Sequence, residues 1–425
     1  MRKVFSIVMV MLSLVMRGQT LEECQQAAAD NYPQIKRYAL ISRQTEESVR
    51  NIGKSWLPQL SAMAQATWQS DVVTLPEAMG NMLTQAGVDM KGLRKDQYRV
   101  GLDLSQTLFD GGSISQQQEV SRRQGEVEAA RTAVDIYQVR QRVNDLYFLL
   151  LLTKEQRELS QDRLTLLLAS ERQLQSLYSK GAAAECDYNT VKAERITAQQ
   201  QEEELAGLFH DTSLQLSTLC GMEVKNPVIP STPSTVNGMS NNRPELSLID
   251  QQISLLNAQE KALNGALMPK LSLFASGYYG YPGYDMYHDM FSHDWTWNGM
   301  IGARVTWNIG ALYTRKGDKA KLEAQRAMAE VQRETFLFNN RLQTIQQNGA
   351  IERYRQQMNH DDDIVDLRAR VRKASESKLA HGIIDAPTLV RDINNEHAAK
   401  IQRNIHIIEW LKQQYDLLIT LNIER

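Results

Sequence analysis

Four stretches of the chain alternate apolar and polar residues with the period of a β-strand. In residues 59–69 the apolar side chains share one face, namely Leu60, Ala62, Ala64, Ala66 and Trp68. Polar residues such as Gln65 and Thr67 fall on the other face, which predicts a strand between two unlike environments. Residues 98–108 repeat this alternation, and two further strands are predicted at 270–281 and 295–307.

Between the strands, apolar residues recur at helical spacing. Residues 113–180 carry Val139, Val143, Leu146 and Leu150 in a 4-3-4 pattern, which indicates coiled-coil packing. A helix over 184–219 is expected to return after Gly181, so that 113–219 forms a helical hairpin. The other predicted helices cover 20–56, 244–267, 311–380 and 385–421, and the prolines and glycines of 70–97 and the aromatic segment 282–294 predict loops.

The chain also contains an internal repeat. Asn31-Tyr32-Pro33 reappears as Asn242-Arg243-Pro244, and Leu57-Pro58 as Met268-Pro269, both at an offset of 211 residues. Such a repeat predicts one supersecondary plan built twice. We therefore expect a first repeat at 19–220, a linker that contributes an equatorial segment at 221–243, and a second repeat at 244–425, with the hairpin 311–421 as counterpart of 113–219.

Composition and the N-terminus limit the classes of protein to which this chain can belong. The formal net charge is −2, and no large basic field exists, so nucleic acid is not an expected partner. Residues 1–18 read as a secretory signal peptide, because Arg2 and Lys3 precede a short apolar stretch. No later apolar run approaches the ~20 residues of a spanning helix, so a mature protein that crosses a membrane must use strands.

No pattern of residues in the sequence predicts a catalytic, cofactor or metal site. The sequence has no phosphate loop, no paired-carboxylate motif and no CxxC, so we expect no enzyme activity and no cofactor. His360 with the three following aspartates is not expected to bind metal, because consecutive helical residues point in different directions. Cys24, Cys186 and Cys220 form no disulfide framework, and we expect them to be isolated buried thiols.

Four alternating strands cannot close a barrel, and lipid does not tolerate open sheet edges. Strands pooled from three chains would give twelve, an allowed number for a membrane barrel. Aromatic residues near the strand ends are predicted to form its girdle: Trp68, Tyr98, Trp295, Trp297 and Trp307. The polar faces of the strands suit a water-filled lumen.

Three marks together resemble a known family. They are the Leu57-Pro58 and Met268-Pro269 strand starts, the turn Ser105-Gln106-Thr107-Leu108-Phe109-Asp110-Gly111-Gly112, and the segment Tyr178-Ser179-Lys180-Gly181 followed by Asp187 and Ala193-Glu194. In this order the marks are similar to those of the TolC-type outer-membrane efflux proteins, the outer membrane factors. The resemblance covers residues 20–421.

This resemblance implies a mainly α protein with a β-barrel part. A homotrimer would place a 12-stranded barrel in the outer membrane of a Gram-negative bacterium, joined to a long coiled-coil α-helical barrel in the periplasm. It implies an exit duct for efflux or type I secretion that performs no chemistry. The expected partners are outer-membrane lipid, a periplasmic adaptor (membrane fusion) protein and an inner-membrane transporter of the RND or ABC type.

The resemblance also implies a periplasmic gate. Asp187, six residues after Gly181, stands at the family's acidic position. The second repeat departs from the pattern, because Thr388 and Arg391 occupy the corresponding positions, with Asp385 and Asp392 nearby. The helical turns at Gly181 and Gly382 are the expected adaptor contacts, a role compatible with that of glycine C-caps.

The main alternative is a periplasmic coiled-coil adaptor or scaffold protein, in which the strands are soluble hairpins that cap a coiled coil. Membrane fractionation separates the two hypotheses. An outer-membrane duct is a trimer that requires detergent, whereas a scaffold is a freely soluble monomer.

Overall fold

The computed structural model describes residues 19–88, 92–233 and 241–422, and the expected signal peptide lies outside them. Long helices and one antiparallel sheet form this part of the chain, which confirms the mainly α class with a β part. The chain divides into two compact units. The helical unit comprises the described residues of 1–38, 129–249 and 331–425, and the sheet unit comprises those of 39–128 and 250–330.

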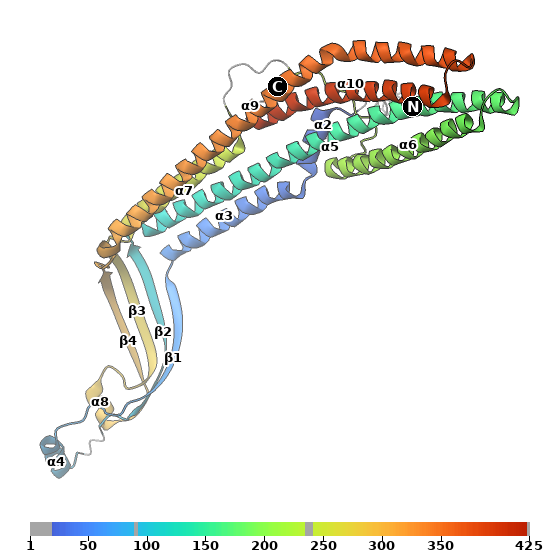
Figure 1. The fold of residues 1–425 in the computed structure, drawn as a ribbon. Coiled ribbons are helices and arrows are strands. Elements are labelled where there is room, and N and C mark those ends of the chain that lie inside the picture. Colours follow the sequence, from blue (N-terminus) through green and yellow to red (C-terminus); the bar gives the residue numbers. More distant parts are fainter. Residues whose placement is uncertain (1–18, 89–91, 234–240, 423–425) are drawn as a thin grey trace, which may run out of the picture. The chain divides into compact units, whose positions relative to one another are not determined.

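The sheet contains four strands in chain order (Figure 1): β1 (Gln59–Trp68), β2 (Asp96–Phe109), β3 (Lys270–Tyr281) and β4 (Thr296–Thr306). All neighbours are antiparallel, with Ala62 opposite Leu102 and Leu102 opposite Gly277. This register joins the apolar faces of the strands into one surface, because side chains opposite each other across a ladder share a face.

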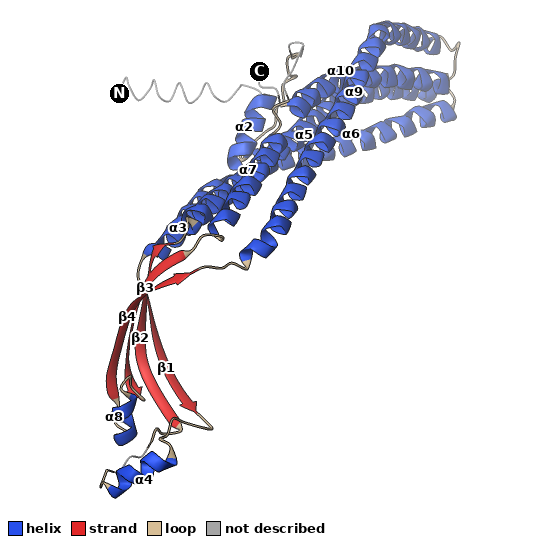
Figure 2. Ribbon diagram, turned by 90° about the vertical axis from the view of Figure 1, so that its left-hand side faces the viewer, coloured by secondary structure: helices blue, strands red, loops and turns tan. Residues whose placement is uncertain are grey.

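The loops expected between the strands are partly helical. Segment 70–97 contains α4 (Glu77–Gln85), and segment 282–294 contains α8 (Met286–Phe291). Both helices lie near the end of the sheet where β1 ends (Figure 2). The Asp285 carboxylate accepts a hydrogen bond from the backbone N of His288 at 3.0 Å and so begins α8.

The helix expected over 20–56 is interrupted. It consists of α2 (Leu21–Asn31), η1 (Pro33–Lys36), α3 (Arg37–Gly53) and η2 (Lys54–Trp56). The break occurs at Tyr32, which is extended because the following Pro33 disfavours the helical region there. The prediction of one continuous helix was therefore wrong at this point.

The remaining helices begin and end close to their expected limits. They are α5 (Ser113–Ser179), α6 (Glu185–Cys220), α7 (Pro244–Gly265), α9 (Ala311–Ala380) and α10 (Ala386–Leu421). Within the described residues, no helix is both long and apolar enough to cross a membrane.

Two apolar clusters and one polar network hold the helical unit together. Tyr147, Phe148 and Leu151 of α5 are fully buried against residues of α2, α6 and α10. Beside this cluster, the amide of Asn144 donates to the Asp416 carboxylate at 2.6 Å, and Lys412 lies 2.9 Å from Asp416. A buried carboxylate needs such partners, so this network fixes how α5 meets α10.

The first part of the expected linker packs on the same core. The Tyr147 hydroxyl lies 2.8 Å from the carbonyl O of Gln19 and 2.7 Å from that of Val228, and it accepts from the backbone N of Val228 at 3.0 Å. Tyr415 donates to the carbonyl O of Ser231 at 3.0 Å. Tyrosines of α5 and α10 thus anchor the segment after α6.

We expect Tyr147→Phe to lower the free energy of unfolding by about 1–3 kcal/mol, because the change leaves buried backbone groups of the linker without their partner. Thermal unfolding followed by circular dichroism measures the loss. Tyr178→Phe is the matched control, since Tyr178 is exposed near the end of α5. Equal midpoints for the two variants would show that the Tyr147 hydroxyl does not stabilise the linker.

Candidate functional site

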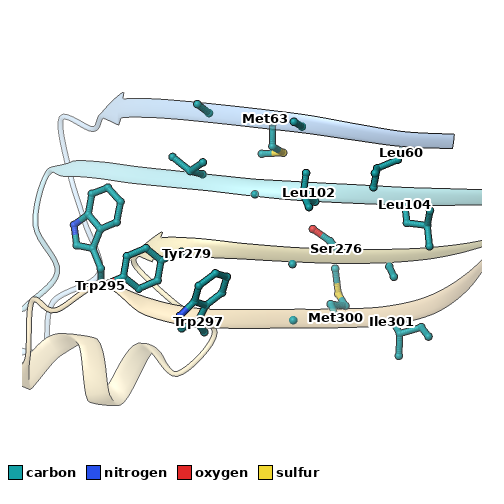
Figure 3. Close-up of a pocket in the computed structure, with 17 residues that line it drawn as sticks. Leu60, Met63, Leu102, Leu104, Ser276, Tyr279, Trp295, Trp297, Met300 and Ile301 are labelled. Carbon is teal, nitrogen blue, oxygen red and sulfur yellow. The ribbon is translucent and has the colours of Figure 1, made fainter.

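One face of the sheet is apolar and open (Figure 3). It presents Leu60, Leu102, Trp297 and Ile301, and the last two side chains are 82% and 83% exposed. Apolar side chains line a shallow hollow of about 1100 Å³ on this surface. Water-soluble monomers rarely expose an apolar surface that is continuous over four strands, so this face requires an apolar environment.

The opposite face of the same strands is polar. Arg99 of β2 donates to the Gln65 side chain of β1 at 2.7 Å, and Asp103 lies opposite Ser61 in the register. Arg304 of β4 places its guanidinium 4.9 Å from the ring centre of Phe274. The sheet therefore separates an apolar from an aqueous environment across its thickness.

The five predicted girdle aromatics lie at the two ends of the sheet. Trp68, Tyr98, Trp295 and Trp297 are at the end near α8, where the rings of Tyr98 and Trp295 stack with centroids 6.2 Å apart. Trp307 is at the end that leads into α9, and its indole N donates to the carbonyl O of Leu267 at 3.0 Å. Rings with one apolar face and one polar handle suit a boundary between lipid and water.

In the helical unit, both predicted turns are glycine caps. Gly181 and Gly382 have φ of +71° and +67°, which favours glycine because it lacks a Cβ. Each glycine bonds back to the last turn of its helix. The backbone N of Gly181 donates to the carbonyl O of Tyr178 at 2.9 Å, and that of Gly382 donates to the carbonyl O of Leu379 at 2.9 Å. The two hairpin ends therefore have equivalent backbones.

The predicted gate acids occupy different environments. Asp187 of α6 accepts from the backbone N of Ala386 at 3.2 Å, and so links the first hairpin to the start of α10. Asp385 is exposed and caps α10 through the backbone N of Thr388 at 3.2 Å, and hydrogen bonds with Thr388 lower the pKa of its carboxyl. Asp392 is buried and accepts from the Ser375 hydroxyl at 2.6 Å, whereas Arg391 is exposed. Asp187 and Asp385 meet at one helix start, and Asp392 does not join them.

Sequence reasoning missed a set of ion pairs near the hairpin ends. Arg163 of α5 pairs with Glu194 of α6, and Arg372 of α9 pairs with Glu396 of α10, so each pair lies within one hairpin. The amide of Asn394 donates to Glu194 at 2.9 Å and joins α10 to α6. No signal in the sequence distinguishes these charged residues from solvated ones on a helix surface. Each hairpin is thus closed by a partly buried ion pair, while these two links between hairpins are single hydrogen bonds.

A histidine lies buried in the same region. His397 of α10 is 8% exposed, and its Nε2 has no hydrogen-bond partner among the described residues. Burial, together with the nearby Arg163 and Lys400, lowers the pKa of His397 to about 4. The imidazole is therefore neutral at pH 7. Asp361, part of the acidic run after His360, accepts instead from His406, with the Nδ1 and carboxylate 2.8 Å apart.

Comparison with known proteins gives a consistent result. A family model described as "Outer membrane efflux protein" matches residues 24–222. No curated protein matches the sequence significantly.

Several solved channels share the fold. The Campylobacter jejuni CmeC outer membrane channel is 16% identical, with a TM-score of 0.67 over 94% of this chain and 85% of that one. The outer membrane protein VceC of Vibrio cholerae is 13% identical, with a TM-score of 0.68 over 94% and 95%. The Neisseria gonorrhoeae MtrE outer membrane channel in its open state is 16% identical, with a TM-score of 0.65 over 94% and 88%.

The buried imidazole predicts a pH dependence of stability. Its pKa of about 4 in the folded protein lies below the ordinary value of 6.5, so the unfolded chain binds the proton more tightly. The contribution of neutral His397 to the free energy of unfolding is fully present above pH ~6.5. It is lost as the pH drops towards 4, a loss of about 3 kcal/mol in all.

We expect His397→Leu to flatten the fall in thermal midpoint between pH 7 and pH 5. His210→Leu, at an exposed position of α6, is the control and should keep the wild-type slope. A His397→Leu protein with an unchanged slope would contradict this account.

Proposed function

We propose that the chain is a member of the outer membrane efflux protein family, whose model matches residues 24–222, and that three copies form the exit duct of an efflux or type I secretion machine. The chain is an outer-membrane channel subunit with a helical part in the periplasm, and not an enzyme. The resemblance of the sequence to this family implies a trimeric channel that works with adaptor and pump partners. The finer assignment rests on the sheet and on the helical hairpins.

The observation that carries the proposal is the two-sided sheet with unpaired edges. Within the described chain, β1 and β4 each pair with a single neighbour, so each leaves one row of backbone groups without a strand partner. Lipid does not hydrate these groups, and the open apolar face requires lipid. Pairing β1 of one copy with β4 of the next satisfies both demands, and three copies close a barrel of twelve strands.

The surface of α9 supports the same assembly. Apolar residues recur along it at helical spacing and remain exposed: Phe338, Leu342, Ile345, Ile364, Leu367 and Val371. A stripe with spacing of three and four residues is the pattern of a coiled-coil seam. We assign this stripe to packing against helices of a neighbouring subunit, which would continue the tube into the periplasm.

We further propose that the hairpin ends open and bind the periplasmic adaptor. The caps at Gly181 and Gly382 present equivalent turns, which suits repeated contacts with an adaptor that serves an RND or ABC transporter. The repeats 19–220 and 244–425 then supply one turn each, and linker 221–243 supplies the equatorial segment. Because the ion pairs lie within hairpins, separating the hairpins would leave the pairs intact. It would break the links at Ala386 and Asn394 and the apolar cluster that joins Leu167 of α5 to Leu389 of α10.

The first test concerns the sheet. Leu102→Arg places a charge in the middle of β2 on the apolar face, at a cost of ~2–4 kcal/mol in lipid. We expect the heat-modifiable trimer recovered from outer membranes to fall severalfold. Ser105→Arg is the matched control on the same strand, since it points to the polar face and should assemble normally. Normal assembly of Leu102→Arg, or a wild-type protein that is a soluble monomer, would favour the scaffold alternative.

The second test concerns the gate. Asp187→Asn removes a negative charge and weakens the link to the backbone N of Ala386. We expect lower cation selectivity and higher conductance of the purified trimer in planar bilayers. Glu185→Gln makes the same charge change at an exposed neighbour in the first turn of α6. Identical currents for the two variants would remove Asp187 from the gate.

A further inference from the structure

Helix α2 packs against the C-terminal end of α6, and a cysteine of each helix lies in the contact. Cys24 is 0% exposed and Cys220 is 4% exposed, and both belong to one apolar cluster with Leu216 and Val143. The Cys220 thiol lies 3.4 Å from the carbonyl O of Cys24. All three cysteines of the chain are free thiols in the structure, and Cys186 is exposed, contrary to the expectation of three isolated buried thiols.

The surroundings fix the register of the two helices. The Asn31 amide donates to the carbonyl O of Thr218 at 3.3 Å and to that of Leu219 at 3.2 Å, directly before Cys220. Gly221 ends α6 with φ of +68°, and a Cβ there would lie 2.7 Å from the Asn31 side chain. The close approach of α2 to the end of α6 thus depends on Gly221. This approach keeps the Cys24 and Cys220 thiols near each other.

The two thiols differ in reactivity. A hydrogen bond between them lowers the pKa of Cys220 and raises that of Cys24. The thiolate is the nucleophile in thiol–disulfide exchange, and these shifts exist only in the packed site, so either thiol can attack first before the helices close. The protein matures outside the cytoplasm, where disulfides form and persist.

We propose that Cys24 and Cys220 are joined by a disulfide in the mature protein, introduced by a periplasmic dithiol oxidase during folding. One of the two thiolates, for example that of Cys220, attacks one sulfur of the oxidase disulfide, which forms a mixed disulfide and releases one oxidase thiolate. The Cys24 thiolate then attacks the sulfur of Cys220, which forms the intramolecular bond and releases the second oxidase thiolate. Two electrons and two protons leave the chain, and the oxidase becomes a dithiol. The bond forms before the helices close, because the packed site excludes the oxidase.

This bond would tie the first helix of the mature chain to the end of the first hairpin. The two residues are 196 positions apart, so the bond closes a long loop and restricts the unfolded chain. Cys186 cannot take part, because it lies at the other end of α6, ~50 Å away at 1.5 Å per residue. Its thiol provides an internal reference for any measurement of free cysteines.

The first experiment counts thiols in the full-length protein purified from outer membranes of cells with a functional dithiol oxidase. The protein is denatured without reductant in iodoacetamide and weighed intact. We expect one alkylation, at Cys186, and three after reduction, whereas Cys24→Ser should give two without reductant. Three alkylations of the wild type, or a bridge that involves Cys186, would overturn the proposal.

The second experiment measures the contribution to stability. Reductant should lower the thermal midpoint of the wild type and of Cys186→Ser by about 5 °C or more. The double variant Cys24→Ala/Cys220→Ala should unfold at a lower temperature but be indifferent to reductant, which separates the loss of the bond from the loss of packing. An unchanged wild-type midpoint after complete reduction would exclude a stabilising bond. Conductance is not part of either readout, so failure here does not bear on the proposed duct.

Discussion

The unsatisfied hydrogen-bonding groups at the edges of the sheet are the constraint from which the rest of this protein follows. A strand edge in water is solvated at little cost, but β1 and β4 carry apolar side chains such as Leu60 and Ile301 that belong in lipid. In lipid, each unpaired backbone group costs several kcal/mol. The same strands therefore require a partner strand and an apolar solvent at once, and only a closed ring of subunits provides both.

The helical unit meets a different demand, because the proposed duct must hold its shape and, in our proposal, still open at the hairpin ends. Far from the turns, α5 and α10 are fixed by buried aromatic rings and by the network around Asp416. Near the turns, the partly buried pairs Arg163–Glu194 and Arg372–Glu396 stiffen each hairpin from within. The polar links between hairpins at Ala386 and Asn394 are single hydrogen bonds, which water can replace at a net cost of only ~1 kcal/mol each. A buried apolar cluster that includes Leu167 of α5 and Leu389 of α10 also joins the hairpins there. Opening at the turns would therefore expose this cluster as well as replace the hydrogen bonds.

The contact between Cys24 and Cys220 shows how helix α2 is stabilised by the helices beside it. Helix α2 is short and interrupted at Tyr32, so it gains little stability from its own backbone. Its contacts with α6, through Asn31 and Cys24, compensate by fixing it to a rigid helix end. A covalent bond at this point would make the start of the mature chain as durable as the hairpin beside it.

The sequence by itself determined the elements, because strand and helix periods are local properties of the side-chain pattern. Alternation located the four strands within two residues, and the heptad-like spacing located α5. Local breakers were less decisive: Pro33 interrupted an expected helix, and α4 and α8 formed within expected loops. Only the tertiary structure decided which residues far apart in the sequence contact each other. Asp187 reaches the start of α10, Asp392 turns inward to Ser375, Glu194 pairs with Arg163, and Cys24 meets Cys220. A charged or sulfur-bearing residue on a helix has the same local pattern whether its face is solvated or packed, so its partner is set by the packing of helices far apart in the chain.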